Sequence, residues 1–547
     1  MKKSLISIVL VVIILATCML IPVNEVKATE EVFINKAQTA TATLDEEGTL
    51  TINGTGVVGE GLDKTRYVSS YQKDIGENNI SEDNEIIISE FWNGKNLYFE
   101  GKDVKKVIIG EGITGIENDI FNQCDNLRSI EIPSTVSYIG DKAFHYTYGL
   151  EEIKINENNT HFSSDSGVLF DKNKTQLINY PKGKTDTQYV IPDTVTNIKG
   201  LAFTNNGLVK TIQISKNVEQ VESNAFRSCH SLENIIVAEE NPNYLTIDGI
   251  LYNKDKTELI CYPSEKQGKT YTIDENVKTI KEYAFSNNYH LEDVDVSTVE
   301  AIERGAFYGI QTLKKVKLPE AITQMGTAVF SGDISLKEVT LPKGITKLEA
   351  CTFTDANGLL KVNLPSTITE IGDYAFTGCS YLQELAIPVG TKKIGKQILQ
   401  SCYKIEKLYI PSTVEEIGSL GEKLSNTDIY CKGGTFAQEY LEKNQYECKI
   451  DNVAPVMIIT YSELEKTKQP VDVIIRTLES VAPIESWEST LEGKKMTKNY
   501  TQNTEEKISL TDLVGNVAQA EIKIENIDTE VPNILVTYEK VEGTNVK

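Results

Sequence analysis

Histidine, tryptophan and positive charge are scarce in this chain of 547 residues. It contains four histidines and two tryptophans, and 79 aspartates and glutamates outnumber 55 lysines and arginines, which gives a formal net charge of −24. Such an acidic surface repels phosphate backbones and anionic membranes over a screening length of about 8 Å at physiological salt. The composition therefore argues against nucleic acid as a partner.

Catalytic and metal-binding motifs are also missing. The four histidines, His145, His161, His230 and His290, show no i, i+4 pair, and the chain has no G-x-S-x-G, H-E-x-x-H or phosphate-binding glycine loop. We interpret His145 and His230 as solvent-facing turn residues. Abundant acidic residues leave open a carboxylate pair for glycoside hydrolysis. The prediction is a protein that is not an enzyme and that uses neither cofactor nor metal.

One long apolar run lies at the N-terminus. Two lysines precede the run Leu5 to Ile21, and the triplet Val26-Lys27-Ala28 offers a small-residue cleavage site. This pattern predicts that residues 1–28 are a signal peptide, which gives a secreted or cell-surface protein that contacts the membrane only before cleavage. The alternatives are an uncleaved transmembrane anchor and lipoprotein processing at Cys18.

A spacing of 23 residues recurs through most of the chain. It is marked by ten anchors within the text L-x-x-I-x-I-P-x-x-V-x-x-I-G-x-x-A-F-x-x-C: Phe121, Phe144, Phe203, Phe226, Phe285, Phe307, Phe330, Phe353, Phe376 and Leu399. A fixed period of this length indicates a solenoid in which each repeat stacks on the next. We predict a mainly β fold, with a leucine-rich-repeat solenoid over residues 101–426.

Two gaps of 59 residues, or 23 plus 36, interrupt the period. They contain matching inserts near residues 162–185 and 244–268, each with two short apolar runs around a polar turn. That pattern predicts two β-hairpins that project from one side of the solenoid. Their aromatic residues are candidates either for a contact site or for the core: Phe170, Tyr180, Tyr252 and Tyr262.

The flanking regions lack the repeat. Residues 29–100 contain two short alternating segments around an Asp45–Gly48 turn and predict an N-terminal cap. Residues 427–451 read as strand, helix and strand, a C-terminal cap. Residues 452–530 have widely spaced strand patterns with Trp487 as a candidate core residue, which favours a β-sandwich. Because Pro532 and Tyr538 repeat Pro455 and Tyr461 at an offset of 77, we expect residues 531–547 to begin a second, truncated sandwich.

Eight cysteines follow Cys18. Cys124, Cys229, Cys379 and Cys402 share the slot three residues after an anchor, which should point inward, where a free cysteine behaves as a small hydrophobe. Cys379 and Cys402 lie on neighbouring turns, so a bridge between them is geometrically possible. The better disulfide candidate is the pair Cys431 and Cys448.

The repeat text from Leu127 to Phe144 and from Leu359 to Cys379 resembles the BspA-like, Treponema-type leucine-rich repeat family of bacterial surface proteins. The tail, with its turn Asp512 to Asn516, resembles bacterial Ig-like domains of secreted Gram-positive proteins. The resemblance implies a secreted or surface adhesin that binds host, matrix or other cell-surface ligands. Folds of this kind carry many ligands, so the partner stays unnamed.

The outward positions of each L-x-x-I-x-I segment form the best candidate surface, on the concave side if the array curves as other leucine-rich repeats do. An acidic triplet in one turn adjoins a basic triplet in the next, and we predict ligand binding there: Glu292, Asp293, Asp295, Lys314, Lys315 and Lys317. Cross-strand ion pairs that only maintain register are the competing explanation.

The sequence thus predicts a non-enzymatic adhesion or interaction protein whose partner is a protein or glycoprotein. A structural cell-envelope protein is the first alternative. A carbohydrate-binding or glycan-acting protein is the second.

Overall fold

The computed structural model describes residues 32–33, 37–58, 103–121, 124–421, 424–461, 471–478, 495–501, 504–525 and 533–537. The predicted signal peptide and Trp487 lie outside the described residues. Contacts divide the chain into two units. Unit 1 comprises Met1–Asp186, Pro192–Leu208 and Gln220–Ala225, and unit 2 comprises Thr187–Ile191, Val209–Glu219 and Phe226–Lys547. No helix in the described ranges is long and apolar enough to cross a membrane.

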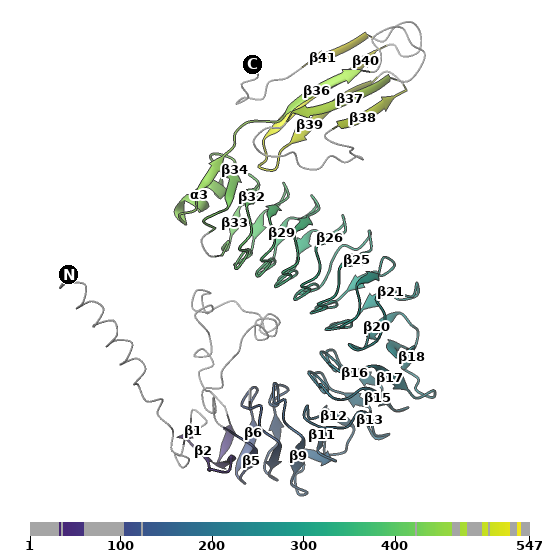
Figure 1. Cartoon of the computed structure of the whole chain (residues 1–547), viewed down its shortest axis with the longest axis vertical. Coiled ribbons are helices and arrows are strands. Elements are labelled where there is room, and N and C mark those ends of the chain that lie inside the picture. The colour runs from purple at the N-terminus through teal and green to yellow at the C-terminus, as the bar shows by residue number, and fades with distance from the viewer. Residues whose placement is uncertain are drawn as a thin grey trace, which may run out of the picture. The chain divides into compact units, whose positions relative to one another are not determined.

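Unit 1 opens with antiparallel strands and continues as stacked turns (Figure 1). The L-x-x-I-x-I segments form a parallel sheet, called here the ladder, which grows from the cap in the order β1(Val32–Phe33), β2(Ala40–Leu44), β3(Thr49–Gly54), β5(Lys106–Ile109), β7(Ser129–Ile132) and β9(Glu152–Ile155). The two predicted cap strands are β2 and β3. Asp45 closes the turn between them, because its carboxylate accepts the N–H groups of Glu47 and Thr49.

A second set of shorter strands follows each ladder strand along the chain. In unit 1 this second sheet contains β4(Gly56–Val58), β6(Ile113–Ile116) and β8(Tyr138–Ile139), paired in parallel. The alternation of buried and exposed residues in the ladder explains the arrangement, since Ile130 and Ile153 point into the core and are fully buried.

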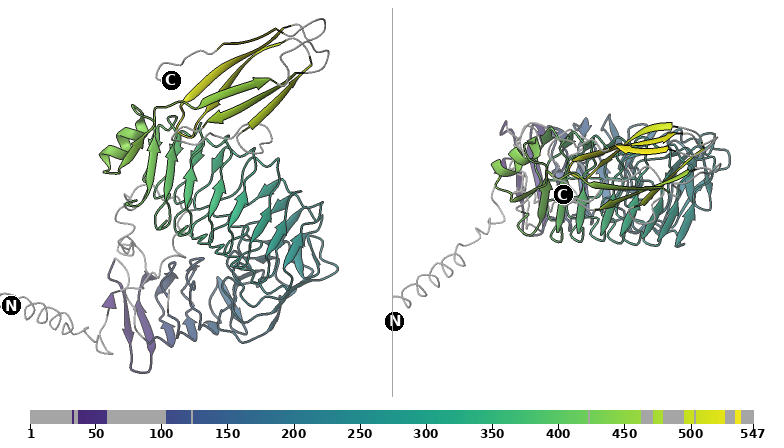
Figure 2. Two further views of the ribbon diagram at one scale, coloured as in Figure 1. Left: turned by 45° about the horizontal axis from the view of Figure 1, so that its top comes forward. Right: turned by 90° about the horizontal axis from the view of Figure 1, so that it is seen from above.

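Unit 2 continues both rows of strands over many more turns, divided among several sheets, with its short strands side by side (Figures 1 and 2). Its ladder contains β13(Gln188–Val190), β15(Thr211–Ile214), β17(Asn234–Val237), β21(Thr270–Thr272), β23(Asp293–Asp295), β25(Lys315–Lys317), β26(Glu338–Thr340), β28(Lys361–Asn363), β30(Glu384–Ala386), β32(Lys407–Ile410), β34(Asp428–Cys431) and β35(Cys448–Ile450). Its second sheet contains β20(Glu258–Cys261), β22(Thr279–Ile280), β24(Ala301–Ile302), β27(Lys347–Leu348), β29(Glu370–Ile371), β31(Lys393–Ile394) and β33(Glu416–Ile417). The predicted solenoid of roughly 23-residue turns is therefore confirmed.

A column of anchor side chains fills the centre of the turns. The rings of Phe307, Phe330, Phe353 and Phe376 are fully buried and stack with centroids 5.6 Å apart and planes within 11° of parallel. The N–H of each of these four residues also donates to the carbonyl just before the next anchor, as from Phe353 to Ala375 at 2.8 Å. Ring stacking and these bonds set the period at one turn per 23 residues, or 22 between Phe285 and Phe307, which stack at 5.2 Å.

Each insert contains the predicted antiparallel hairpin, and each also adds a turn to the stack, which the prediction missed. Tyr180 lies 23 residues before Phe203 and stacks on it at 5.2 Å, and Tyr262 stacks on Phe285 at 5.1 Å in the same way. Each insert thus adds a complete turn with a tyrosine anchor. The strands of the inserts join the second sheets. In unit 1, β10(Phe162–Asp165), β11(Val168–Asp171) and β12(Gln176–Asn179) precede β14(Asn197–Ile198) and β16(Gln220–Val221), and in unit 2, β18(Tyr244–Ile247), β19(Ile250–Asn253) and β20 precede β22 and β24. Phe170, Tyr180, Tyr252 and Tyr262 are all buried core residues.

The C-terminal part of unit 2 contains a cap and two small sheets. The cap has the predicted strand, helix and strand, with α3(Phe436–Lys443) between β34 and β35. Beyond it, the antiparallel sheets β36(Val456–Tyr461), β37(Val471–Leu478), β38(Lys495–Tyr500) and β39(Thr504–Thr511), β40(Val517–Glu525), β41(Asn533–Thr537) share one apolar core. Assignment of this part as Ig-like stays a prediction.

The sequence predicts that residues 531–547 begin a second sandwich. The strand that the structure describes there, β41, belongs instead to the sheet of β40. β41 pairs antiparallel with β40 over five residue pairs, from Glu521 with Thr537 to Glu525 with Asn533. The edge of the nine-residue strand β40 leaves unpaired N–H and C=O groups that β41 satisfies.

The eight described cysteines are free thiols, and the four in the anchor slot are buried as predicted. The thiols of Cys379 and Cys402 each donate to the carbonyl of an anchor, Phe353 and Phe376, at 3.0 and 3.1 Å. Neither predicted disulfide is present. Cys431 and Cys448 lie on paired strands, but their register is offset by two residues, since Cys448 faces Ile429.

Asp333 occupies the inward slot that the other Phe- or Leu-anchored turns fill with Cys, Asn, Ala, Thr or Ile, and it is completely buried. One carboxylate oxygen accepts the N–H of Ile310 at 2.7 Å, whereas the other has no hydrogen-bond partner. Burial therefore raises the pKa of Asp333 well above its ordinary value of 3.8.

Asp333→Asn tests the effect of this burial. A raised folded pKa means that the folded state retains a proton that the unfolded chain releases, so the free energy of unfolding falls as pH rises above about 4. The amide keeps the acceptor and removes the ionisation, so the variant should exceed the parent by about 1–3 kcal/mol at pH 8 and match it near pH 4. Urea unfolding at both pH values measures this. A variant less stable than the parent at pH 8 would contradict the assignment.

Candidate functional site

The ladder brings the two predicted triplets together. β23 and β25 pair in parallel with Asp293 facing Lys315 and Asp295 facing Lys317. The carboxylate of Asp295 lies 2.9 Å from the ammonium of Lys317. Glu292, one residue before β23, contacts two lysines on opposite sides, Lys269 and Lys314, each at 2.7 Å. All six predicted residues therefore form one continuous charged surface.

These contacts strongly lower the pKa values of the two carboxylates, Glu292 and Asp295. Hydrogen bonds from Lys269 and Lys314 lower the pKa of Glu292 to about 2. Hydrogen bonds from Ser297 and then Lys317 lower the pKa of Asp295 to about 2. Both side chains are thus ionised at physiological pH and are paired within the protein.

The same alternation of charge continues elsewhere on the turns. In the ladder, Arg128 pairs with Glu151 within unit 1 and Lys210 with Glu233 within unit 2. In the second sheet of unit 2, ion pairs link neighbouring turns at 22- or 23-residue separation: Lys278–Glu300, Lys281–Glu303, Lys347–Glu370, Lys392–Glu415 and Lys393–Glu416. This recurrence supports register-keeping as one role of the charges.

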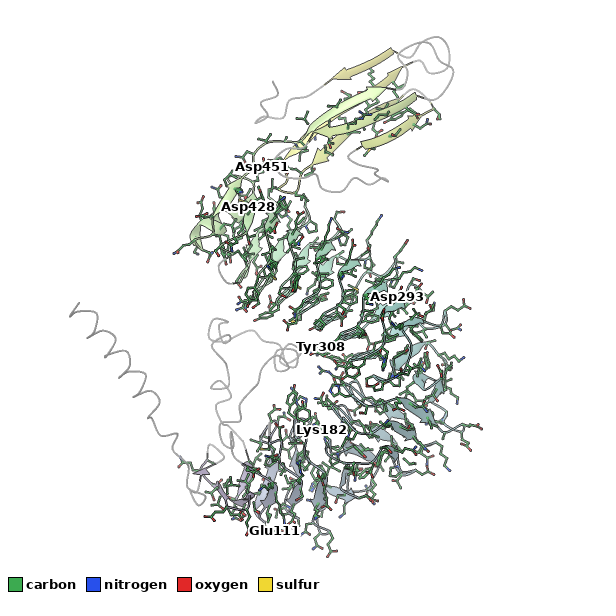
Figure 3. All side chains as sticks on the ribbon, viewed as in Figure 1. Glu111, Lys182, Asp293, Tyr308, Asp428 and Asp451 are labelled. Carbon is green, nitrogen blue, oxygen red and sulfur yellow. The ribbon has the colours of Figure 1, made fainter. Side chains whose placement is uncertain are left out.

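The ladder of unit 2 lies on the convex side of its curved stack of turns, which corrects the conditional expectation of a concave position. Figure 3 shows Asp293 on the outer side, whereas Tyr308, next to the anchor Phe307, lies on the inner side. The inner side is formed by the anchor segments, whose N–H groups bond from turn to turn, as from Gly309 to Ser331. Outward ladder side chains are the accessible ones, and Lys314 and Lys317 are more than 60% exposed.

The histidines do not assemble a reactive site. His145 is buried rather than solvent-facing, because its ring packs on Tyr146 at 4.0 Å. His230 is partly covered, its Nδ1 lies 2.5 Å from the hydroxyl of Tyr289, and burial lowers its pKa. Both histidines lie in turns, as predicted, but His145 is buried and His230 is only partly exposed. Across the described ranges, no group of three His, Cys, Asp or Glu side chains is placed to hold a metal ion.

Sequence reasoning also missed two buried cations. Lys182 donates to the carbonyl of Phe144 at 2.7 Å, and burial lowers its pKa to about 7. Ser264 occupies the equivalent position in the second insert and donates to the carbonyl of Cys229, which indicates a structural role for the slot. The guanidinium of Arg227 lies 3.8 Å from the ring centre of Tyr283. The sequence contains one signal of this shared position, because Lys182 directly follows Pro181 and Ser264 directly follows Pro263.

Replacing Lys314 and Lys317 together with Met should reduce the acid sensitivity of unit 2. A lowered carboxylate pKa contributes stability that is present above the ordinary values of 4.5 and 3.8 and is lost as pH falls to about 2. Without their lysines, Glu292 and Asp295 titrate nearer those ordinary values, so the parent should lose more unfolding free energy than the variant between pH 5 and pH 2. Urea unfolding across this range measures the difference.

Lys315→Met is the matched control, since this exposed lysine forms no ion pair with any described residue. It should leave the acid sensitivity of the parent unchanged. An equal effect of both variants would show that the ion pairs do not cause the acid dependence.

Comparison with known proteins identifies the family of the repeat region. A model of the BspA type leucine rich repeat region matches residues 94–188, 182–309, 261–360 and 300–421, with six copies of the repeat. No curated protein matched. A leucine-rich repeat protein from Eubacterium ventriosum ATCC 27560 is 25% identical, with 71% of this chain and 96% of that one covered and a TM-score of 0.45.

A leucine rich cell surface protein from Faecalibacterium prausnitzii A2-165 is also similar. It is 22% identical, with 70% of this chain and 94% of that one covered and a TM-score of 0.39. The family matches overlap and together span residues 94–421, more than half of the chain. They cover the anchors, both inserts and the charged ladder. The chain belongs to the BspA-type leucine-rich repeat family.

Proposed function

We propose that this protein is a non-enzymatic, secreted or cell-surface adhesion protein of a bacterium, Gram-positive by the resemblance of its tail, that binds a protein or glycoprotein through its solenoid. Membership of the family supports an interaction role in general. The observation that carries the proposal is the convex ladder of unit 2, where outward side chains on consecutive strands form one accessible surface. Repeat proteins use such extended surfaces for binding.

The candidate contact region is the pair of triplets from Glu292 to Lys317. Lys314, Lys315 and Lys317 are exposed. The ammonium groups of Lys314 and Lys317 can donate beyond the one carboxylate that each contacts, and that of Lys315 pairs with no carboxylate of a described residue. Charged surfaces of this kind contribute mainly to specificity and association rate. A glycoprotein or protein with acidic groups therefore suits this part of the ladder.

A structural cell-envelope protein is the second candidate, and the ion pairs favour it. Glu292 and Asp295 are already neutralised by lysines of the same molecule, as expected if the ladder only maintains register and solubility.

Solid-phase binding of the chain from residue 29 onward to matrix glycoproteins, host-cell surface proteins and glycans separates these candidates. The test variant carries Lys314→Glu, Lys315→Glu and Lys317→Glu. We expect saturable binding by the parent and at least tenfold weaker binding by the variant, because three attractive charges become repulsive.

The matched control carries Lys347→Glu, Lys392→Glu and Lys393→Glu, three ion-paired lysines of the second sheet. It should bind as the parent does, which separates a local effect from the change in net charge. Circular dichroism must show that both variants are folded. No saturable binding by the folded parent would contradict the proposal and favour the structural candidate.

A further inference from the structure

Four consecutive turns of unit 2 each expose one large apolar side chain. Ile334 and Tyr403 lie four residues after their anchors, Tyr381 five and Leu360 seven. Their exposed fractions are 43% for Ile334, 41% for Leu360, 57% for Tyr381 and 74% for Tyr403. These four residues are called the edge stripe.

Bonds between neighbouring turns show that the segment four to seven residues after one anchor lies beside the same segment of the next turn. The hydroxyl of Ser380 lies 2.7 Å from the side-chain oxygen of Asn357, and both lie four residues after an anchor. The N–H of Leu360 donates at 3.0 Å to the carbonyl of Lys337, which holds the same position one turn earlier. With strands about 4.8 Å apart, three steps make a stripe of roughly 14 Å.

Stacking of the turns does not require these apolar groups. Asn357 and Ser380 occupy the position of Ile334 and Tyr403 in the two turns between them, so polar side chains suit it. None of the four belongs to the buried hydrophobic core of unit 2. Single exposed apolar residues are common, whereas one on each of four consecutive turns favours an interaction surface.

Lysines without ion pairs surround the stripe. Lys404 follows Tyr403 directly, Lys361 follows Leu360, and Lys337 precedes Leu360 by one turn. These three, together with Lys315, are exposed and form no ion pair with any described residue, unlike Lys314 and Lys317. The outward ladder positions from β25 to β32 hold six lysines and three glutamates: Lys314, Lys315, Lys317, Lys337, Lys361 and Lys407, and Glu338, Glu384 and Glu406.

This local excess of positive charge contrasts with the net charge of −24 of the whole chain. Cations that lack carboxylate partners on an otherwise acidic protein favour a negatively charged ligand through charge complementarity.

We propose that the edge stripe and its unpaired lysines bind an acidic polypeptide segment that carries apolar side chains. The proposal rests on the proposed function, in which the solenoid binds a protein ligand. It adds the location of the binding site and the chemical class of the ligand. Two of the four residues, Ile334 and Leu360, are aliphatic and offer no flat ring for stacking on a sugar. Tyrosine and aliphatic side chains at the centre with charged side chains at the rim are the usual composition of a protein interface.

Fluorescence anisotropy with labelled synthetic peptides tests this proposal on the chain from residue 29 onward. The probes are 15-residue peptides that alternate Glu with Leu or Phe, the same peptides with Lys in place of Glu, Glu-rich peptides without apolar residues, and a sulfated glycan. The parent should bind the acidic apolar peptides. Tyr381→Ser with Tyr403→Ser, and separately Lys361→Glu with Lys404→Glu, should each weaken binding at least tenfold.

Tyr138→Ser with Tyr148→Ser is the matched control, because both tyrosines are similarly exposed, at 45% and 48%, but lie in unit 1. This variant should bind as the parent does. Equal binding by parent and stripe variants, stripe-dependent binding of the glycan alone, or no saturable peptide binding up to about 1 mM would each overturn the proposal. Dimerisation of the parent that the stripe variants lose would replace the separate partner with a second copy and also overturn it.

The stripe variants are also run against the matrix and cell-surface panel. Panel binding retained by folded stripe variants would overturn this inference while the proposed function stands. Panel binding absent from the parent, together with stripe-dependent peptide binding, would contradict the proposed function and leave the stripe supported.

Discussion

The contact between one anchor ring and the next is the interaction on which the rest of the molecule depends. A single turn buries only a few apolar side chains, which does not offset the roughly 1–2 kcal/mol of backbone entropy lost by each ordered residue. Stacking changes this balance, because Phe330 is covered by Phe307 on one side and by Phe353 on the other. Hydrogen bonds between anchor segments and between ladder strands then join each turn to its neighbours. Stability in such an array comes from the interfaces between turns.

This constraint also decides which surfaces are available for function. The inner side is formed by anchor segments whose backbone groups are engaged from turn to turn, so its geometry changes little among repeats. Most outward ladder positions lie on the surface and vary from turn to turn, whereas Tyr409 is buried against Tyr430. Ion pairs use part of this freedom to hold neighbouring strands, as between Asp295 and Lys317. Stacking of the turns does not account for the exposed apolar residues and unpaired lysines between Lys315 and Lys404.

Much of this architecture could be predicted from the sequence, because each turn has the same packing requirement and therefore needs similar residues at the same positions. The anchors, the buried cysteine slot and the facing triplets follow from the period alone. Tyr180 and Tyr262 were missed as anchors because they are not Phe, although each lies 23 residues before the next one. The burial of His145 and the convex position of the ladder depend on local packing and on the relative widths of the sheets, which a linear pattern does not contain.

Deletion of one complete turn tests the account most directly. Removing residues 331–353 leaves Phe330 and Phe376 again 23 positions apart, whereas removing only residues 331–342 places them out of register. The account predicts that the first variant keeps its β-sheet circular dichroism and unfolds cooperatively in urea, with a smaller dependence on urea concentration because less surface is exposed. The second variant should lose cooperative unfolding. If both deletions were equally tolerated, or if both abolished folding, stacking at a fixed 23-residue step would not be what holds this solenoid together.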